Sequence, residues 1–199
     1  MPKQVDHDQR RAELAQAVWR LIRRSGLGGV TIRALAEESG WSSGAVRHYL
    51  PSRAAILAFA AEQVSAQAEA QLRRLPLPGT PRENLLTFLE ATLPLEPSSR
   101  EWLEVWLAFV GAAVSDPDLA DVQGLTYRDL HAALVEILSE FAGQGWTLSD
   151  PPAAAARDLQ ALLDGLSVHL LLDVLTPVQA RSALERAVDR LSLAPPPAP

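Results

Sequence analysis

The stretch TIRALAEESGWSSGAVRHYLPSR, residues 31–53, decides which fold this chain is expected to adopt. Two short amphipathic patterns in it flank a break formed by Gly40, Trp41 and Ser42. Thr31 and Ser42 stand where each can cap a helix, and Gly40 can adopt the positive φ that ends the first one. The spacing therefore predicts a helix-turn-helix, whose second helix is short enough to enter a DNA major groove.

The second helix of this motif has an inner and an outer side. Val46, Tyr49 and Leu50 supply apolar surface to the inner side, and Pro51 ends the helix. The positions left facing outward are Ser43, Gly44, Ala45, Arg47 and His48. Because Gly44 and Ala45 are small, the backbone of this helix can come close to bases and phosphates.

The rest of the chain also favours helices, because apolar residues recur at intervals of three and four rather than two. About nine helices are expected, with those outside the motif near residues 8–25, 53–75, 82–92, 99–114, 118–142, 153–174 and 177–193. The predicted fold class is all-α: a three-helix helix-turn-helix DNA-binding domain over residues 1–52, then a helical ligand-binding and dimerisation domain over residues 53–193. Residues 194–199, APPPAP, are predicted to be a disordered tail.

The charges are distributed unevenly along the chain. The net charge is −6, which alone argues against a partner such as DNA. Residues 1–55, however, carry nine Lys and Arg against five Asp and Glu, whereas residues 56–199 carry nine Arg against nineteen acids. A basic first quarter on an acidic body is typical of a small DNA-binding head, although chance asymmetry is the alternative.

Several classes of protein are disfavoured by the sequence. The chain has no Cys, which excludes disulfides and fits a cytoplasmic location. It has no uncharged apolar stretch of about 18 residues and no signal-peptide core, so no membrane partner is expected. The four His are scattered without metal-ligand spacing, and no glycine-rich phosphate loop is present. Neither an enzyme nor a cofactor or metal is therefore expected.

Residues 8–65 resemble the tetracycline-repressor (TetR) family of bacterial transcriptional regulators. The residues that carry the resemblance are Thr31, Arg33, Ala36, Glu37, Gly40, Ser42, Gly44, His48, Tyr49, Pro51, Ser52 and Leu57. The chain departs from the family pattern at Arg47, Leu50 and Arg53, which stand where Tyr, Phe and Lys are common. The segments WLAFVGAAVSDPDLA and LLDGLSVHLLLD further resemble the regulatory domain of the betaine-inhibitor-type subgroup.

The resemblance implies which side chains contact DNA. Ala45 and Arg47 are the candidates for base readout, since Arg can bond guanine and Ala can touch a thymine methyl. The candidates for phosphate contact are Thr31, Ser42, Ser43, His48, Tyr49 and Arg53. Arg47 can instead bind a phosphate or pair within the protein, and Tyr49 can instead pack in the core.

The resemblance also implies a pocket for a small apolar or aromatic effector. Trp102, Trp106 and Phe109 lie on one helix face, where such rings either fill a core or line a pocket. His131 is a further lining candidate. His169, in an apolar helix, is a pocket donor, a dimer-interface group or a satisfied core histidine.

The last two predicted helices have the apolar faces expected of a homodimer. Gly165 allows close approach there, and the surplus of leucine suggests a four-helix bundle shared by two subunits. The residues predicted for this interface are Leu159, Leu162, Leu166, Leu170, Leu184 and Val188.

Together these features predict a homodimeric, ligand-responsive repressor that binds double-stranded DNA at a palindromic operator. A small effector would favour a conformation in which the two heads no longer fit successive major grooves. Two alternatives remain: an activator or ligand-independent regulator of the same fold, and an all-helical dimeric interaction module without DNA binding.

Overall fold

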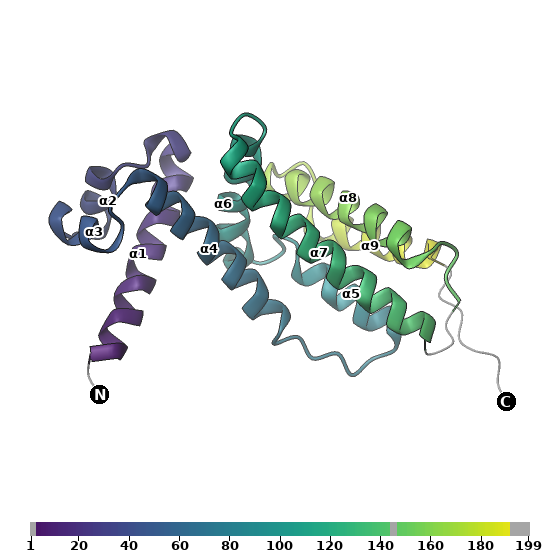
Figure 1. The fold of residues 1–199 in the computed structure, drawn as a ribbon. Coiled ribbons are helices and arrows are strands. Elements are labelled where there is room, and N and C mark those ends of the chain that lie inside the picture. Colours follow the sequence, from purple (N-terminus) through teal and green to yellow (C-terminus); the bar gives the residue numbers. More distant parts are fainter. Residues whose placement is uncertain (1–2, 144–146, 192–199) are drawn as a thin grey trace. The chain divides into compact units, whose positions relative to one another are not determined.

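The computed structural model describes residues 3–143 and 147–191, and the predicted tail at 194–199 lies outside them. Within these ranges the fold is all-α, as predicted (Figure 1). It contains nine α-helices and one short 3-10 helix in these ranges: α1 (Lys3–Ser25), η1 (Leu27–Gly29), α2 (Ile32–Ser39), α3 (Ser43–Tyr49), α4 (Arg53–Leu72), α5 (Pro81–Ala91), α6 (Pro97–Ala113), α7 (Pro117–Gly143), α8 (Pro152–Leu171) and α9 (Pro177–Arg190).

Local sequence signals explain why the later helices begin where they do. Each helix from α5 to α9 has Pro at its first position, where the fixed φ suits a helix and the missing N–H is not needed. Two of them also carry a capping box. In α5, the backbone N–H of Thr80 donates to Glu83 Oε2 at 2.9 Å. In α9, the N–H of Thr176 donates to Gln179 Oε1 at 2.9 Å.

The chain divides into two compact units. The first comprises residues 1–67 and 101–120, and the second comprises residues 68–100 and 121–199. This division differs from a boundary after residue 52, because the first part of α4 packs with α1. In that part of α4, Ile56 and Phe59 are buried, and the guanidinium of Arg11 lies 5.0 Å from the centre of the Phe59 ring. Helices α4, α6 and α7 each continue from one unit into the other.

The first unit buries the apolar stripe of α1. Leu14, Val18, Leu21 and Ile22 are each at most 2% exposed, which agrees with the periodicity of the sequence. Helix α1 contacts α2, and α2 contacts α3. The motif therefore rests on α1 as its structural support.

The second unit has its own core, to which α5, α7, α8 and α9 contribute. Helix α5 contacts α9, and α9 contacts α8. Two ion pairs join α5 to α9: Arg82 with Asp189 at 2.7 Å and Arg181 with Glu90 at 3.1 Å. Within the parts of the chain that the structure describes, none of the helices combines the length and apolar character that crossing a membrane requires.

The leucines predicted for the dimer interface lie mostly in this core. Those at most 4% exposed in a single chain are Leu159, Leu166, Leu170, Leu184 and Val188. Leu162 is half-buried. An amphipathic pattern shows that a face is buried but not by what, and here the covering surface is the chain itself. The five buried side chains therefore leave almost no area for a partner subunit.

Candidate nucleic-acid interface

The helix-turn-helix forms through the local contacts that its sequence predicts. Thr31 Oγ1 accepts a hydrogen bond from the N–H of Ala34 at 3.0 Å, and Ser42 Oγ accepts one from the N–H of Ala45 at 3.1 Å. Gly40 ends α2 in the left-handed region with φ 73°. Because both helix starts are capped and the turn is set by a glycine, the motif is specified locally.

Helix α3 presents a polar outer face. Val46 is fully buried, and Leu50 just beyond the helix is 6% exposed. Ser42, Ser43, Gly44, Arg47 and His48 are exposed, and Ala45 is half-buried. The structure thus brings six of the eight predicted DNA-contacting residues onto or beside this short helix: Ser42, Ser43, Ala45, Arg47, His48 and Tyr49.

The half-buried Tyr49 stands between two other aromatic rings. Its ring meets Trp41 edge-on with centroids 5.6 Å apart, and His48 with centroids 5.3 Å apart. These rings border an open hollow of about 640 Å³ beside α3. Its lining residues are Arg10, Glu13, Trp41, Ala45, His48 and Tyr49. Trp41 is not among the predicted DNA contacts, although a large aromatic residue in a tight turn is a signal that the sequence carries.

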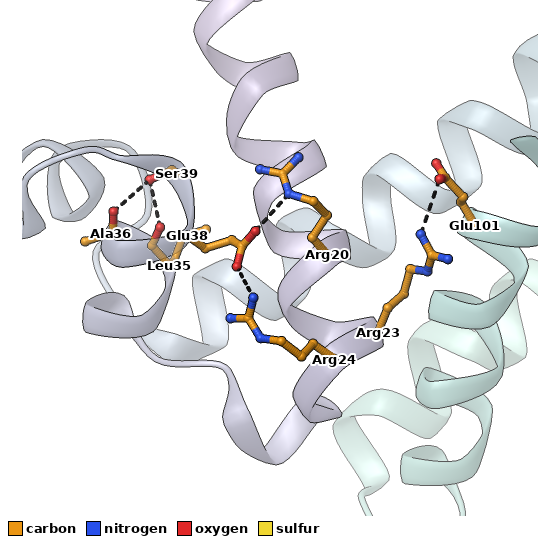
Figure 2. A network of polar contacts seen from close by, with 8 residues as sticks. All are labelled: Arg20, Arg23, Arg24, Leu35, Ala36, Glu38, Ser39 and Glu101. Carbon is orange, nitrogen blue, oxygen red and sulfur yellow. Dashed lines mark hydrogen bonds and ion pairs between the residues drawn. The ribbon is translucent and has the colours of Figure 1, made fainter.

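Most arginines of the first unit are already paired with acids. Figure 2 shows Glu38 of α2 between two arginines of α1. Its carboxylate accepts from Arg20 Nε at 2.8 Å and from Arg24 Nη1 at 2.5 Å. These two hydrogen bonds hold the pKa of Glu38 below its usual value. This pairing holds α2 against α1, and the carboxylate of Glu38 offsets positive charge of the two arginines.

Arg23 connects α1 to α6 within the same unit. It pairs with Glu101 at 3.3 Å, as Figure 2 shows, and it also donates to Glu104. Arg11 pairs with Glu62 at 3.6 Å, and Arg33 pairs with Glu37 on the exposed face of α2 at 3.0 Å. Much of the basic charge counted in the sequence is therefore neutralised by neighbouring acids.

Arg53, a predicted phosphate contact, is engaged with the backbone. Its Nε donates to the carbonyl of Val30 at 3.1 Å, and its Nη2 donates to the carbonyl of Leu27 at 2.8 Å. These bonds tie the start of α4 to the segment before α2. By contrast, among the residues that the structure describes, Arg47 has no hydrogen-bond or ion-pair partner, so its guanidinium is available to a ligand.

The residues predicted to line an effector pocket are divided between the two units. Trp102 and Phe109 of α6 are buried in the first unit, and Trp106 is half-buried there. His131 of α7 is half-buried in the second unit, and His169 of α8 is exposed there. His169 is therefore not a core histidine, because its position in α8 points away from the apolar face that the second unit buries.

One polar cluster in the second unit was not predicted from the sequence. The Tyr127 phenol of α7 donates a hydrogen bond to the half-buried Asp164 carboxylate of α8, and burial raises the pKa of both groups. Neither residue belongs to a recognisable motif. Their pairing depends on how two helices pack, which no local pattern indicates.

Comparison with known proteins identifies the class of molecule that this geometry belongs to. Residues 81–193 match the family model described as "BetI-type transcriptional repressor, C-terminal". The regulator PksA of Bacillus subtilis is 35% identical over 178 residues, which cover 87% of this chain and 84% of that protein. A transcriptional regulator from Pseudomonas aeruginosa is 32% identical, with a TM-score of 0.77 and coverage of 92% and 89%. One from Saccharomonospora viridis, crystallised with choline, is 24% identical, with a TM-score of 0.77 and coverage of 92% and 96%.

Proposed function

Because this chain belongs to the TetR family of DNA-binding transcriptional regulators, we propose that it is a repressor that a small effector releases from a palindromic operator. The observation that carries the proposal is the exposed polar face of α3, which has the size and position of a recognition helix. The positive charge on that face comes from Arg47, whose guanidinium has no partner in the described part of the chain.

In the proposed complex, α3 lies in the major groove. Arg47 bonds the O6 and N7 atoms of a guanine, and Ala45 contacts a thymine methyl. The side chains that position the helix on the backbone are Thr31, Ser42, Ser43, His48, Tyr49 and Arg53. Arg53 also has a structural role, because its hydrogen bonds to the carbonyls of Val30 and Leu27 join the start of α4 to the segment before α2.

The proposed dimer uses the outer side of α8. With the inner leucines buried, the apolar side chains of α8 that remain at least partly exposed include Ala161, Leu162, Val168 and Leu171, and Leu172 just beyond the helix is exposed. Gly165 lies among them and has nothing within 4 Å of where its Cβ would stand. A second copy packing there would place two heads on one palindrome.

The proposed effector acts by shifting a population of conformations. To change operator occupancy from nearly full to nearly empty, it must bind the released conformation more tightly by about 5.5 kcal/mol. The candidate lining within the second unit is His131 and His169. Choline, found in the Saccharomonospora viridis regulator, is the first compound to assay.

The proposal is tested by selecting duplexes from a random library with the full chain and measuring their affinity by fluorescence anisotropy. The repressor account expects a palindromic consensus and an affinity that falls steeply between about 50 and 200 mM salt. Arg186→Ala, in the exposed surface of α9, is the control and should leave affinity unchanged. Failure of the dimer to bind any duplex at low salt would instead indicate an interaction module.

A further inference from the structure

A polar cluster joins α7 to α8 in the second unit. The phenol of Tyr127 donates a hydrogen bond to the carboxylate of Asp164. Nε2 of Gln160 donates to the backbone carbonyl of Tyr127 at 2.8 Å. Since Gln160 and Asp164 lie one turn apart, they come from one face of α8. That face of α8 therefore lies against α7 at Tyr127.

Gln123 extends the cluster by one turn of α7. It precedes Tyr127 by four residues and so lies on the same helix face. The residue is only 8% exposed, and its Oε1 has no hydrogen-bond partner among the described residues. The great majority of buried polar atoms in folded proteins are paired. The unpaired amide oxygen thus marks a position where a donor is missing.

The carboxylate of Asp164 also lacks a cationic partner among the described side chains. It is half-buried, and its pKa is raised because burial outweighs the hydrogen bond from Tyr127. Among the side chains that the structure describes, no Lys, Arg or His forms an ion pair with it. A partly desolvated carboxylate without a cation is stabilised when a cationic ligand supplies one.

We propose that Gln123, Tyr127 and Asp164 form the polar end of the effector site and bind the primary ammonium group of an otherwise apolar ligand. This inference rests on the proposed function as an effector-responsive repressor. The amide oxygen, the phenol oxygen and the carboxylate are three acceptors, and a primary ammonium has three N–H donors. The same two helices also carry Leu134 and Leu163, which belong to the apolar core of the second unit.

This chemistry predicts a definite selectivity. An alcohol can donate one hydrogen bond but brings no charge for Asp164. A quaternary ammonium brings the charge but has no N–H, and proteins usually hold such groups against aromatic faces. The cluster should therefore prefer a primary amine over both.

The test uses calorimetric titration of the full chain with n-hexylamine, 1-hexanol and hexyltrimethylammonium, at about pH 7.5, where the amine is protonated. Hexylamine should bind about tenfold more tightly than either of the other probes. Asp164→Asn should lower hexylamine affinity about tenfold and remove the preference over hexanol. Asp158→Asn, an exposed carboxylate on the same helix, is the matched control and should change nothing.

Gln123→Met distinguishes a role in binding from a role in folding. Met has a similar length and removes the unpaired oxygen, so the variant should have a higher Tm and a lower hexylamine affinity. A purely structural glutamine would change Tm alone, and that outcome would overturn its place in the site. Equal affinity of the wild type for the three probes, or unchanged hexylamine affinity in Asp164→Asn, would overturn the whole proposal.

The calorimetry involves no DNA, so its result is independent of the operator assay. Binding of hexylamine with the expected preference supports this site even if no duplex is selected. In that case only the proposed repressor role is contradicted. Selection of a palindromic duplex together with no hexylamine binding contradicts this site and leaves the repressor role intact.

Discussion

Gly40 ends α2 in a backbone conformation that other residues adopt at a cost. Its φ is 73°, and nothing lies within 4 Å of where a Cβ would stand. The cost of Gly40→Ala therefore comes from the backbone alone, at about 1–2 kcal/mol of unfolding free energy. Urea denaturation monitored by circular dichroism measures this loss.

Gly44 provides the matched control because it has an ordinary helical φ. The nearest neighbouring atom to its Cβ position is Ser42 Oγ at 3.9 Å, which is normal contact. Gly44→Ala should stabilise the chain by about 0.5–1 kcal/mol. If both variants shifted stability in the same direction, the left-handed turn at Gly40 would not be what ends α2.

Arg47 is the residue whose role decides how the operator is recognised. If it reads a guanine, Arg47→Ala should weaken binding to the selected duplex by about 1–3 kcal/mol and weaken binding to unrelated duplex much less. Arg47→Lys should retain the non-specific binding but lose part of the specific binding, since Lys has no planar fork. An equal loss of specific and non-specific affinity in Arg47→Ala would show that the side chain holds a phosphate.

The contact between α1 and α2 should depend on pH through Glu38. Its pKa is lowered in the folded state by Arg20 and Arg24, so the stabilisation is present above the unfolded pKa of about 4.3. It is lost as pH falls through the lower folded pKa. We expect Glu38→Gln to have a lower Tm than the wild type at neutral pH, and we expect this Tm difference to shrink as the pH falls below the unfolded pKa of the carboxyl group.

Glu37→Gln is the control for this pH dependence. Glu37 is 68% exposed and pairs with Arg33 one turn away, whereas the Glu38 side chain is 12% exposed. Exposed pairs contribute little, so the neutral-pH Tm of Glu37→Gln should lie close to that of the wild type. A Tm difference for Glu38→Gln that persisted unchanged at acid pH would contradict the ionic account.

The helices themselves were predictable because their ends are set by neighbours in sequence. Thr31 and Ser42 cap α2 and α3 as predicted, and Gly40 has the predicted positive φ. Pro177 begins α9, where the sequence placed it. Each of these features depends on a few adjacent residues, so periodicity and capping rules were sufficient.

Contacts between distant elements were not predictable in this way. Arg53 bonds the carbonyls of Val30 and Leu27, and Tyr127 meets Asp164, because separate helices pack together. Leu159 and Leu184 were apolar on the expected faces, but their pattern did not reveal that one chain buries both. Sequence periodicity gives the direction of a face and not the identity of its partner.

The proposed dimer contact can be tested by substituting a glycine whose side-chain position is open in the single chain. Gly165 is exposed on α8, and a Cβ there would meet nothing within 4 Å. Gly165→Trp should therefore leave Tm nearly unchanged while it prevents a second copy from approaching closely. Sedimentation velocity should show a dimer for the wild type and a monomer for the variant.

The matched variant Gly111→Trp is made on α6, at an exposed glycine whose added Cβ also meets nothing. It should remain dimeric. If Gly165→Trp remained dimeric with wild-type stability, the outer side of α8 would not be the contact surface.

The central claim is that two copies of this chain insert their α3 helices into successive major grooves of one palindrome. A hydroxyl-radical footprint of the full chain on a selected duplex tests it most directly. The account predicts two protected half-sites related by a dyad, with centres about one to one and a half helical turns apart. It also predicts that Arg47→Ala weakens both half-sites together. A single protected half-site, or no protection at low salt, would contradict it.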